Sequence, residues 1–201
     1  MKKMFAVFVS LLALSGLFAA EHGRVNILDF KEFAANIGTD REDWSPAFEK
    51  AVAQAYATTR CLYVPAGDYP LQKAVEIWKE PTGAFVGGLT LMGDGRYASM
   101  IIQKNPKENA INWTGKTYKG SLNGGTIKDI GISGGAIGLN IKWHNQFTLQ
   151  SCYVAGASEA GIWSEGYSNR FIDIVVRHCP KIGFRGSAHF NDVTIRDGYF
   201  S

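Results

Sequence analysis

Short runs in which apolar residues alternate with polar or small ones recur along the second half of the chain. Their first residues lie 22, 22 and 24 residues apart by subtraction, at Ile127, Leu149, Phe171 and Ile195. Such alternation predicts a short β-strand in each repeat. The third residue of each run is polar, and the pattern places it within the strand. These third residues are Asp129, Ser151, Asp173 and Asp197.

A second motif, glycine followed by a large apolar residue, keeps nearly the same period. It occurs at Gly138-Leu139, Gly161-Ile162 and Gly183-Phe184, with spacings of 23 and 22 residues by subtraction. A unit of this length with strands and turns cannot bury its apolar face alone, so it must stack on copies of itself. The two motifs together predict an all-β fold, a parallel β-solenoid.

The front half of the chain has a different pattern. Ser45 followed by Pro46 is typical of a helix start, with Ser45 as the N-cap. Apolar residues from Phe48 to Tyr56 then fall on one helical face. We expect this helix to cover the first coil of the solenoid. The apolar runs that start at Cys61 and Leu89 are each followed by turn residues and predict strands of the first coils.

Residues 1–20 have the pattern of a cleaved secretion signal. Lys2 and Lys3 precede an apolar run that ends at Phe18, and two alanines follow. We expect the mature protein to begin near Glu21 and to be secreted or periplasmic, with no membrane segment after cleavage. A buried helix is the alternative reading of this run.

Composition limits the remaining possibilities. A formal charge of +3 gives no indication of nucleic-acid binding. The three cysteines, Cys61, Cys152 and Cys179, are an odd number and match no zinc spacing, so we interpret them mainly as core residues. Three of the four histidines, His144, His178 and His189, have no fixed spacing and are interpreted as surface or turn residues, and no metal site is predicted.

Several segments resemble the N-terminal region of the pectate-lyase-superfamily domain. They are VNILDF from Val25, the helix after Ser45, YVPAGDY from Tyr63 and LTLMGDG from Leu89. The resemblance implies that residues 21–201 form a right-handed parallel β-helix with an N-terminal capping α-helix. It also implies a polysaccharide partner. The paired-aspartate, Gly-His-Gly and Arg-x-Lys motifs of polygalacturonases are missing, so their hydrolase chemistry is not implied.

The chain stops directly after a predicted strand, whereas members of this family continue for several more coils. We therefore expect a domain truncated at its C-terminus. An open last coil exposes an unpaired strand edge, which favours self-association.

By resemblance to polygalacturonases, the Gly-Leu/Ile strands form the sheet that carries the substrate groove. Strand alternation directs Leu139, Ile162 and Phe184 inward. A first outward column is then Asn140, Trp163 and Arg185, and a second is Lys142, Glu165 and Ser187. An indole stacks on a sugar ring and a guanidinium binds a uronate carboxylate, so Trp163, Asn140 and Arg185 are candidate binding residues for an acidic polysaccharide. Ordinary exposed residues of a solvated sheet are the alternative.

Cleavage chemistry has candidates in the same two columns. A lyase needs a base, for which Arg185 and Lys142 are candidates, and Glu165 would help to hold a Ca²⁺ ion. A hydrolase needs two carboxylates, for which the pair Glu165 and Glu159 is available. No other cofactor is predicted. The leading function is a secreted carbohydrate-active protein that binds and, in complete form, cleaves an acidic polysaccharide. The alternative is a non-catalytic β-helix: an adhesin, a tailspike-like shaft or an inactive relative.

Overall fold

The computed structural model describes residues 23–77, 88–115, 122–191 and 194–200. The predicted signal, residues 1–20, lies outside this part of the chain. The described residues form mostly β-strands, with one α-helix, α1 (Ser45–Ala57), and one 3-10 helix, η1 (Ile27–Phe33). Neither helix has the length and apolarity needed to cross a bilayer.

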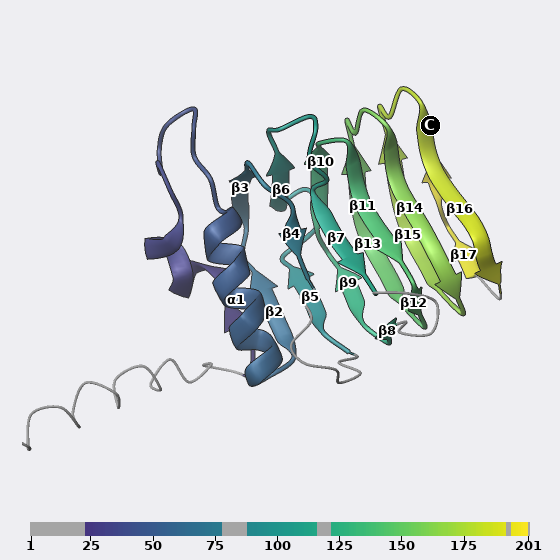
Figure 1. Cartoon of the computed structure of the whole chain (residues 1–201), viewed down its shortest axis with the longest axis horizontal. Helices are drawn as coiled ribbons and strands as arrows, with labels where there is room; N and C mark the ends of the chain where they lie inside the picture. Colours follow the sequence, from purple (N-terminus) through teal and green to yellow (C-terminus); the bar gives the residue numbers. More distant parts are fainter. Residues whose placement is uncertain (1–22, 78–87, 116–121, 192–193, 201) are drawn as a thin grey trace, which may run out of the picture.

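The strands follow one another along the chain, and η1 and α1 lie between the first strand and the second (Figure 1). In the first half they are β1 (Val25–Asn26), β2 (Cys61–Val64), β3 (Gly67–Leu71), β4 (Val75–Glu76), β5 (Thr90–Gly93), β6 (Ser99–Gln103) and β7 (Ile111–Thr114). The later ones are β8 (Leu122–Asn123), β9 (Thr126–Lys128), β10 (Gly131–Gly134), β11 (Ile137–Lys142), β12 (His144–Asn145), β13 (Thr148–Ala155), β14 (Ala160–Tyr167), β15 (Arg170–Arg177), β16 (Ile182–Asn191), β17 (Thr194–Arg196) and β18 (Tyr199–Phe200).

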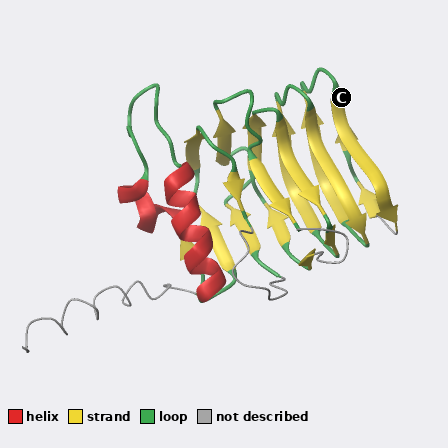
Figure 2. Cartoon of the chain, in the orientation of Figure 1, coloured by secondary structure: helices red, strands yellow, loops and turns green. Residues whose placement is uncertain are grey.

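These strands form parallel sheets whose members lie far apart in sequence. One sheet has the strand order β1-β2-β5-β9-β13-β10-β6-β3. In the same sheet β15 pairs with β13, and β17 and β18 pair with β15. A second runs β4-β7-β11-β14-β16, and β8 pairs with β12. Every pairing between these named strands is parallel. Layers of parallel strands separated by short turns fit a parallel β-helix (Figure 2).

The predicted repeat is confirmed residue by residue. Ile127 pairs with Leu149, Leu149 with Phe171, and Phe171 with Ile195. The first three side chains are fully buried, as an apolar ladder requires, and the ladder continues backward through Leu91 and Leu62 to Val25. Ile195 is 47% exposed, because β17 has a neighbouring strand on one side among the described residues.

The glycine motif is also confirmed, and the structure explains it. Leu139, Ile162 and Phe184 lie in register on β11, β14 and β16. A Cβ atom added to Gly138 would collide with the Val154 side chain, and one added to Gly161 would collide with that of Val176. The two sheets therefore approach one another so closely at the start of these strands that no side chain fits.

The third residue of each run is not an ordinary strand position, which corrects the prediction. Asp129, Ser151, Asp173 and Asp197 all have a positive φ, between 50° and 56°. Each bends the chain between two strand segments, so β13 pairs with β9 before Ser151 and with β10 after it. Asp is enriched several-fold in this left-handed conformation and Ser is small and polar, which explains why polar residues recur there.

Helix α1 forms where the pattern predicted it, with one difference at its start. Ser45 is the first helical residue and not the cap. Its backbone N–H and hydroxyl both donate to Asp43 Oδ1, at 2.9 and 2.5 Å. The apolar face of α1, which includes Phe48, is buried against the first strands, and Figure 1 shows the helix at that end of the sheets.

The cysteines behave largely as expected. All three are free; Cys152 and Cys179 are buried and Cys61 is half-buried. The interpretation as core residues is therefore confirmed for Cys152 and Cys179. His178 lies at a turn with positive φ and is exposed, also as predicted.

Candidate functional site

The outer face of the sheet β4-β7-β11-β14-β16 carries one continuous column of polar and aromatic side chains. Strand pairing places five residues opposite one another on successive strands. They are Glu76, Asn112, Asn140, Trp163 and Arg185. Asn140, Trp163 and Arg185 thus lie in one column, as the sequence predicted, and the column extends two strands further. Whether these residues bind a ligand stays a prediction.

The first part of the column is a ladder of hydrogen-bonded side chains. Asn140 Nδ2 donates to Asn112 Oδ1 at 3.0 Å, and Asn112 Nδ2 donates to Glu76 Oε1 at 2.7 Å. Asn140 is 8% exposed, and its Oδ1 has no hydrogen-bond partner. A buried amide oxygen without a partner is costly, so Asn140 has capacity for one more donor.

Trp163 lies between two cations. The Lys142 ammonium lies 4.1 Å from the centroid of the indole ring and the Arg185 guanidinium 4.0 Å from it. Lys142 comes from β11 and Arg185 from β16, the neighbours of β14 on opposite sides. The cations therefore approach the ring from two sides. Trp163 is partly buried as a result, and its Nε1 is buried with no partner.

The predicted second column is wrong beyond Glu165. Ser164 pairs with Gly186, but Gly166 pairs with Phe190, so β16 contains two more residues than β14 between these two pairs. This bulge falls where Glu165 and Ser187 were expected to lie opposite one another. Because side chains alternate with a period of two, an insertion of two residues leaves the alternation on either side unchanged, so the pattern could not reveal it.

The two candidate acids, Glu159 and Glu165, differ in their surroundings. Glu159 is exposed and forms a 2.5 Å salt bridge with Lys181. Glu165 is partly buried on β14. Among the described residues, no group of three or more His, Cys, Asp or Glu side chains could hold a metal ion. A Ca²⁺ ion held with the help of Glu165, which would take six to eight oxygen ligands in all, stays a prediction.

His144 is fully buried, which corrects its interpretation as a surface or turn residue. Its ring packs against Trp113 and Phe147, with centroids 5.0 and 5.3 Å away. The Nε2–H donates to the Gly124 carbonyl, and Nδ1 has no partner. Burial lowers the pKa of His144 to about 4, although the Gly124 carbonyl opposes the shift. His144 is a neutral core residue and takes no part in the outer face.

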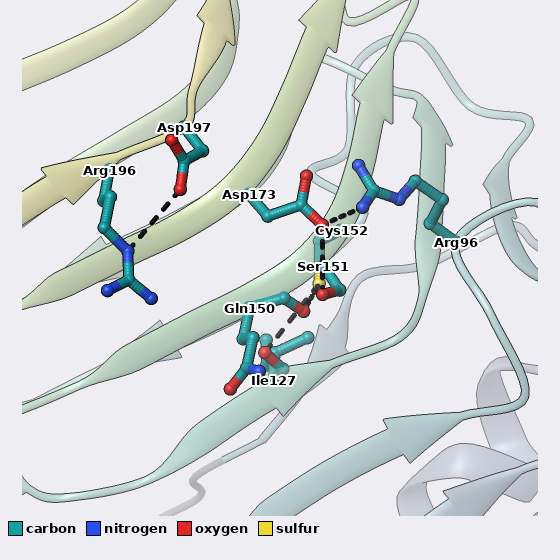
Figure 3. Close-up of polar contacts among 8 residues, drawn as sticks. All are labelled: Arg96, Ile127, Gln150, Ser151, Cys152, Asp173, Arg196 and Asp197. Carbon is teal, nitrogen blue, oxygen red and sulfur yellow. Dashed lines mark hydrogen bonds and ion pairs between the residues drawn. The ribbon is translucent and has the colours of Figure 1, made fainter.

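A group that sequence reasoning did not single out lies on the other sheet, at the bends. Arg96 forms a salt bridge with Asp173, a residue 77 positions later, and Ser151 Oγ donates to the same carboxylate at 3.2 Å (Figure 3). The 22-residue recurrence of polar residues at the bends was the available signal. Near this group, Tyr97 is 68% exposed and packs on Tyr153 with centroids 5.1 Å apart.

Comparison with protein-family models finds no match, and no curated protein matches the chain. Among solved structures, the product of ORF18 of Geobacillus virus E2 superposes with a TM-score of 0.70 at 16% identity, covering 97% of this chain and 39% of the viral one. The Agl-KA catalytic domain superposes with a TM-score of 0.60 at 15% identity, covering 90% and 38%.

A GH87 α-1,3-glucanase from Streptomyces thermodiastaticus strain HF3-3 superposes less closely, with a TM-score of 0.45 at 14% identity, covering 90% of this chain and 41% of the other. The chain thus spans about two fifths of the length of these structures. At such identities, the likeness to the viral protein and to the Agl-KA domain shows a shared fold.

Proposed function

We propose that this chain is the polysaccharide-binding part of an exported carbohydrate-active protein, and that an acidic sugar chain lies along the outer face of β4-β7-β11-β14-β16. The observation that carries the proposal is the column from Glu76 to Arg185, in which Trp163 lies between Lys142 and Arg185. Two cations beside an aromatic ring suit a ligand with both carboxylates and ring faces.

The proposed fold is a right-handed parallel β-helix of the pectate-lyase type, with α1 covering its first coil. The parallel sheets and the shared fold with the Agl-KA catalytic domain support this assignment. In such a fold, equivalent side chains repeat about every 4.8 Å, close to the length of one sugar ring. Successive residues of the column would then meet successive sugars of one polysaccharide.

Cleavage of the bound polysaccharide is proposed for the whole protein, because the chain spans about two fifths of the structures that it resembles. One of Lys142 and Arg185, in its deprotonated form, would act as the base that takes the proton, and the other, as a cation, would stabilise the charge that develops on the uronate. The similarity to a catalytic domain supports an enzyme. Export to the periplasm or medium, with the mature chain starting near Glu21, belongs to the same proposal.

A non-catalytic binding protein is the second candidate. The structure with a TM-score of 0.70 is a viral gene product, which is compatible with a tailspike-like role. Incubation with a panel of polysaccharides distinguishes the two. New reducing ends or absorbance of an unsaturated product would support an enzyme, whereas binding without either product would support the second candidate.

Calorimetric titration with a uronate oligosaccharide and its neutral counterpart tests the binding proposal. Arg185→Ala should weaken binding of the acidic ligand far more than binding of the neutral one, since only the acidic ligand offers a carboxylate. Trp163→Ala should weaken binding by about 1–3 kcal/mol, the range for losing an aromatic stacking surface. Arg170→Ala is the matched control, because Arg170 is exposed on β15 of the other sheet. Equal losses in Arg170→Ala and Arg185→Ala would place the ligand elsewhere.

A further inference from the structure

The indole of Trp163 is covered in the free chain. Lys142 and Arg185 come from the two strands that flank β14. Their charged groups lie 4.1 and 4.0 Å from the centroid of the indole ring, which is close to van der Waals contact. A sugar ring stacks on an aromatic ring at a similar distance. A sugar and these cations therefore compete for the same surface, and the sugar stacks only when a cation moves aside.

Two buried polar atoms at this site have no hydrogen-bond partner. Trp163 Nε1, a donor, and Asn140 Oδ1, an acceptor, are both buried without a partner, and the two residues lie opposite one another in the strand pairing. Asn140 is more than nine-tenths buried. Native structures leave few buried polar groups unpaired, and each such group needs an explanation. A sugar hydroxyl can accept from the indole N–H and donate to the amide oxygen.

We propose that Lys142 and Arg185 make Trp163 selective for acidic sugars by covering it. A uronate carboxylate draws the two cations away from the indole, after which the sugar ring stacks on Trp163 and a hydroxyl pairs with Trp163 Nε1 and Asn140 Oδ1. A neutral sugar has no group to hold the displaced cations. This inference rests on the proposed function, and it explains which sugars the proposed site would select.

The relative strengths of the contacts support this exchange. A cation–π contact and the stacking of a ring on an indole are similar in strength, so stacking by itself does not displace two cations. A charge-assisted hydrogen bond between a guanidinium and a carboxylate is about twice as strong as a neutral hydrogen bond. Only an anionic ligand therefore gains enough from the cations to compensate for uncovering the ring.

A pair of double variants tests the inference. Lys142→Ala/Arg185→Ala removes both the charge and the cover, whereas Lys142→Met/Arg185→Met removes the charge and keeps an apolar stem over the ring. The alanine variant should bind the neutral oligosaccharide about tenfold more tightly than the parent chain, equivalent to about 1.4 kcal/mol. Its affinity for the uronate oligosaccharide should fall to that for the neutral one. The methionine variant should bind the neutral ligand more weakly than the alanine variant does.

Accessibility of tryptophan to acrylamide gives a reading that needs no ligand. The alanine variant should show more quenching than the parent, and the increase should vanish when Trp163→Phe is added. The alanine variant could instead lose affinity for the uronate oligosaccharide while its affinity for the neutral one and its quenching stay those of the parent. That result would show that the cations do not cover Trp163, and it would leave the proposed function standing. A parent chain that binds neither oligosaccharide would instead refute the proposed function itself.

Discussion

At the scale of single residues, His144 shows how a titratable side chain becomes part of the core. Its ring packs with Trp113 and Phe147 in the interior, where a charge is poorly solvated. Burial lowers the pKa of His144 from 6.5 to about 4 in the folded chain. Between these two values the unfolded chain binds more protons than the folded chain, so stability decreases as the pH falls through this window.

The free energy of unfolding should therefore drop by as much as about 3 kcal/mol between pH 6.5 and pH 4 on account of His144. His144→Gln, which cannot titrate, should remove this part of the pH dependence. Urea unfolding at several pH values measures it. His178→Gln is the control for the substitution itself, because His178 is exposed at a turn and outside the core. Matching profiles for parent and His144→Gln would contradict the prediction.

The salt bridge between Arg96 and Asp173 connects parts of the chain 77 residues apart, and the Arg96 side chain is 20% exposed. Arg96→Gln should destabilise the chain by about 1 kcal/mol, the upper part of the range for exposed ion pairs. Arg196→Gln should cost much less, because Arg196 and its partner Asp197 are 68% and 75% exposed. The urea unfolding midpoints of the two variants test this order. Equal shifts would show that the salt bridge between Arg96 and Asp173 adds no more stability than the exposed pair does.

At the scale of elements, the sequence predicts the strands well because their cause is local. Ile127, Leu149 and Phe171 recur with one period and must all point inward, so their pairing follows from the pattern alone. The bend at Ser151 was missed, because a polar residue fits both an outward strand position and a left-handed turn. Only the pairing of β13 with two different strands separates the two readings.

The sequence predicts the strand register of the candidate site but not the contacts between its side chains. Alternation places Asn140, Trp163 and Arg185 on one face, yet it contains no information on side-chain conformation. The cover over Trp163 depends on how Lys142 and Arg185 orient, which neighbouring strands decide together. The burial of His144 was missed for the same reason, since its partner Trp113 lies 31 positions earlier by subtraction.

The close approach of the two sheets at Gly161 gives a prediction at this scale. A Cβ atom there meets the side chain of Val176 and the Gly183 carbonyl, so Gly161→Ala forces two strands apart. We expect a loss of about 1–3 kcal/mol in stability, typical of overpacking. In a Val176→Ala background the same change should cost at least about 0.5 kcal/mol less, because one obstacle is gone. Additive losses in the double variant would show that Val176 does not limit the space.

At the scale of the whole molecule, both sheets end in strands that have a neighbour on one side among the described residues, β16 in one and β17 with β18 in the other. Ile195 and Tyr199 are 47% and 51% exposed at this end, although equivalent residues of earlier strands are buried or partly buried. An unpaired strand edge next to exposed apolar side chains is a template for pairing with another chain.

A polypeptide of these 201 residues should therefore associate with a second copy through β16, β17 and β18. Light scattering during gel filtration should give a mass of at least two chains. Ile195→Lys should shift the population to monomer, because a charge at the apolar end opposes burial between two copies. Thr194→Lys adds the same charge on the same strand without removing an apolar side chain, so it should shift the population less. A parent chain that stays monomeric across a wide range of concentration would show that this end does not pair.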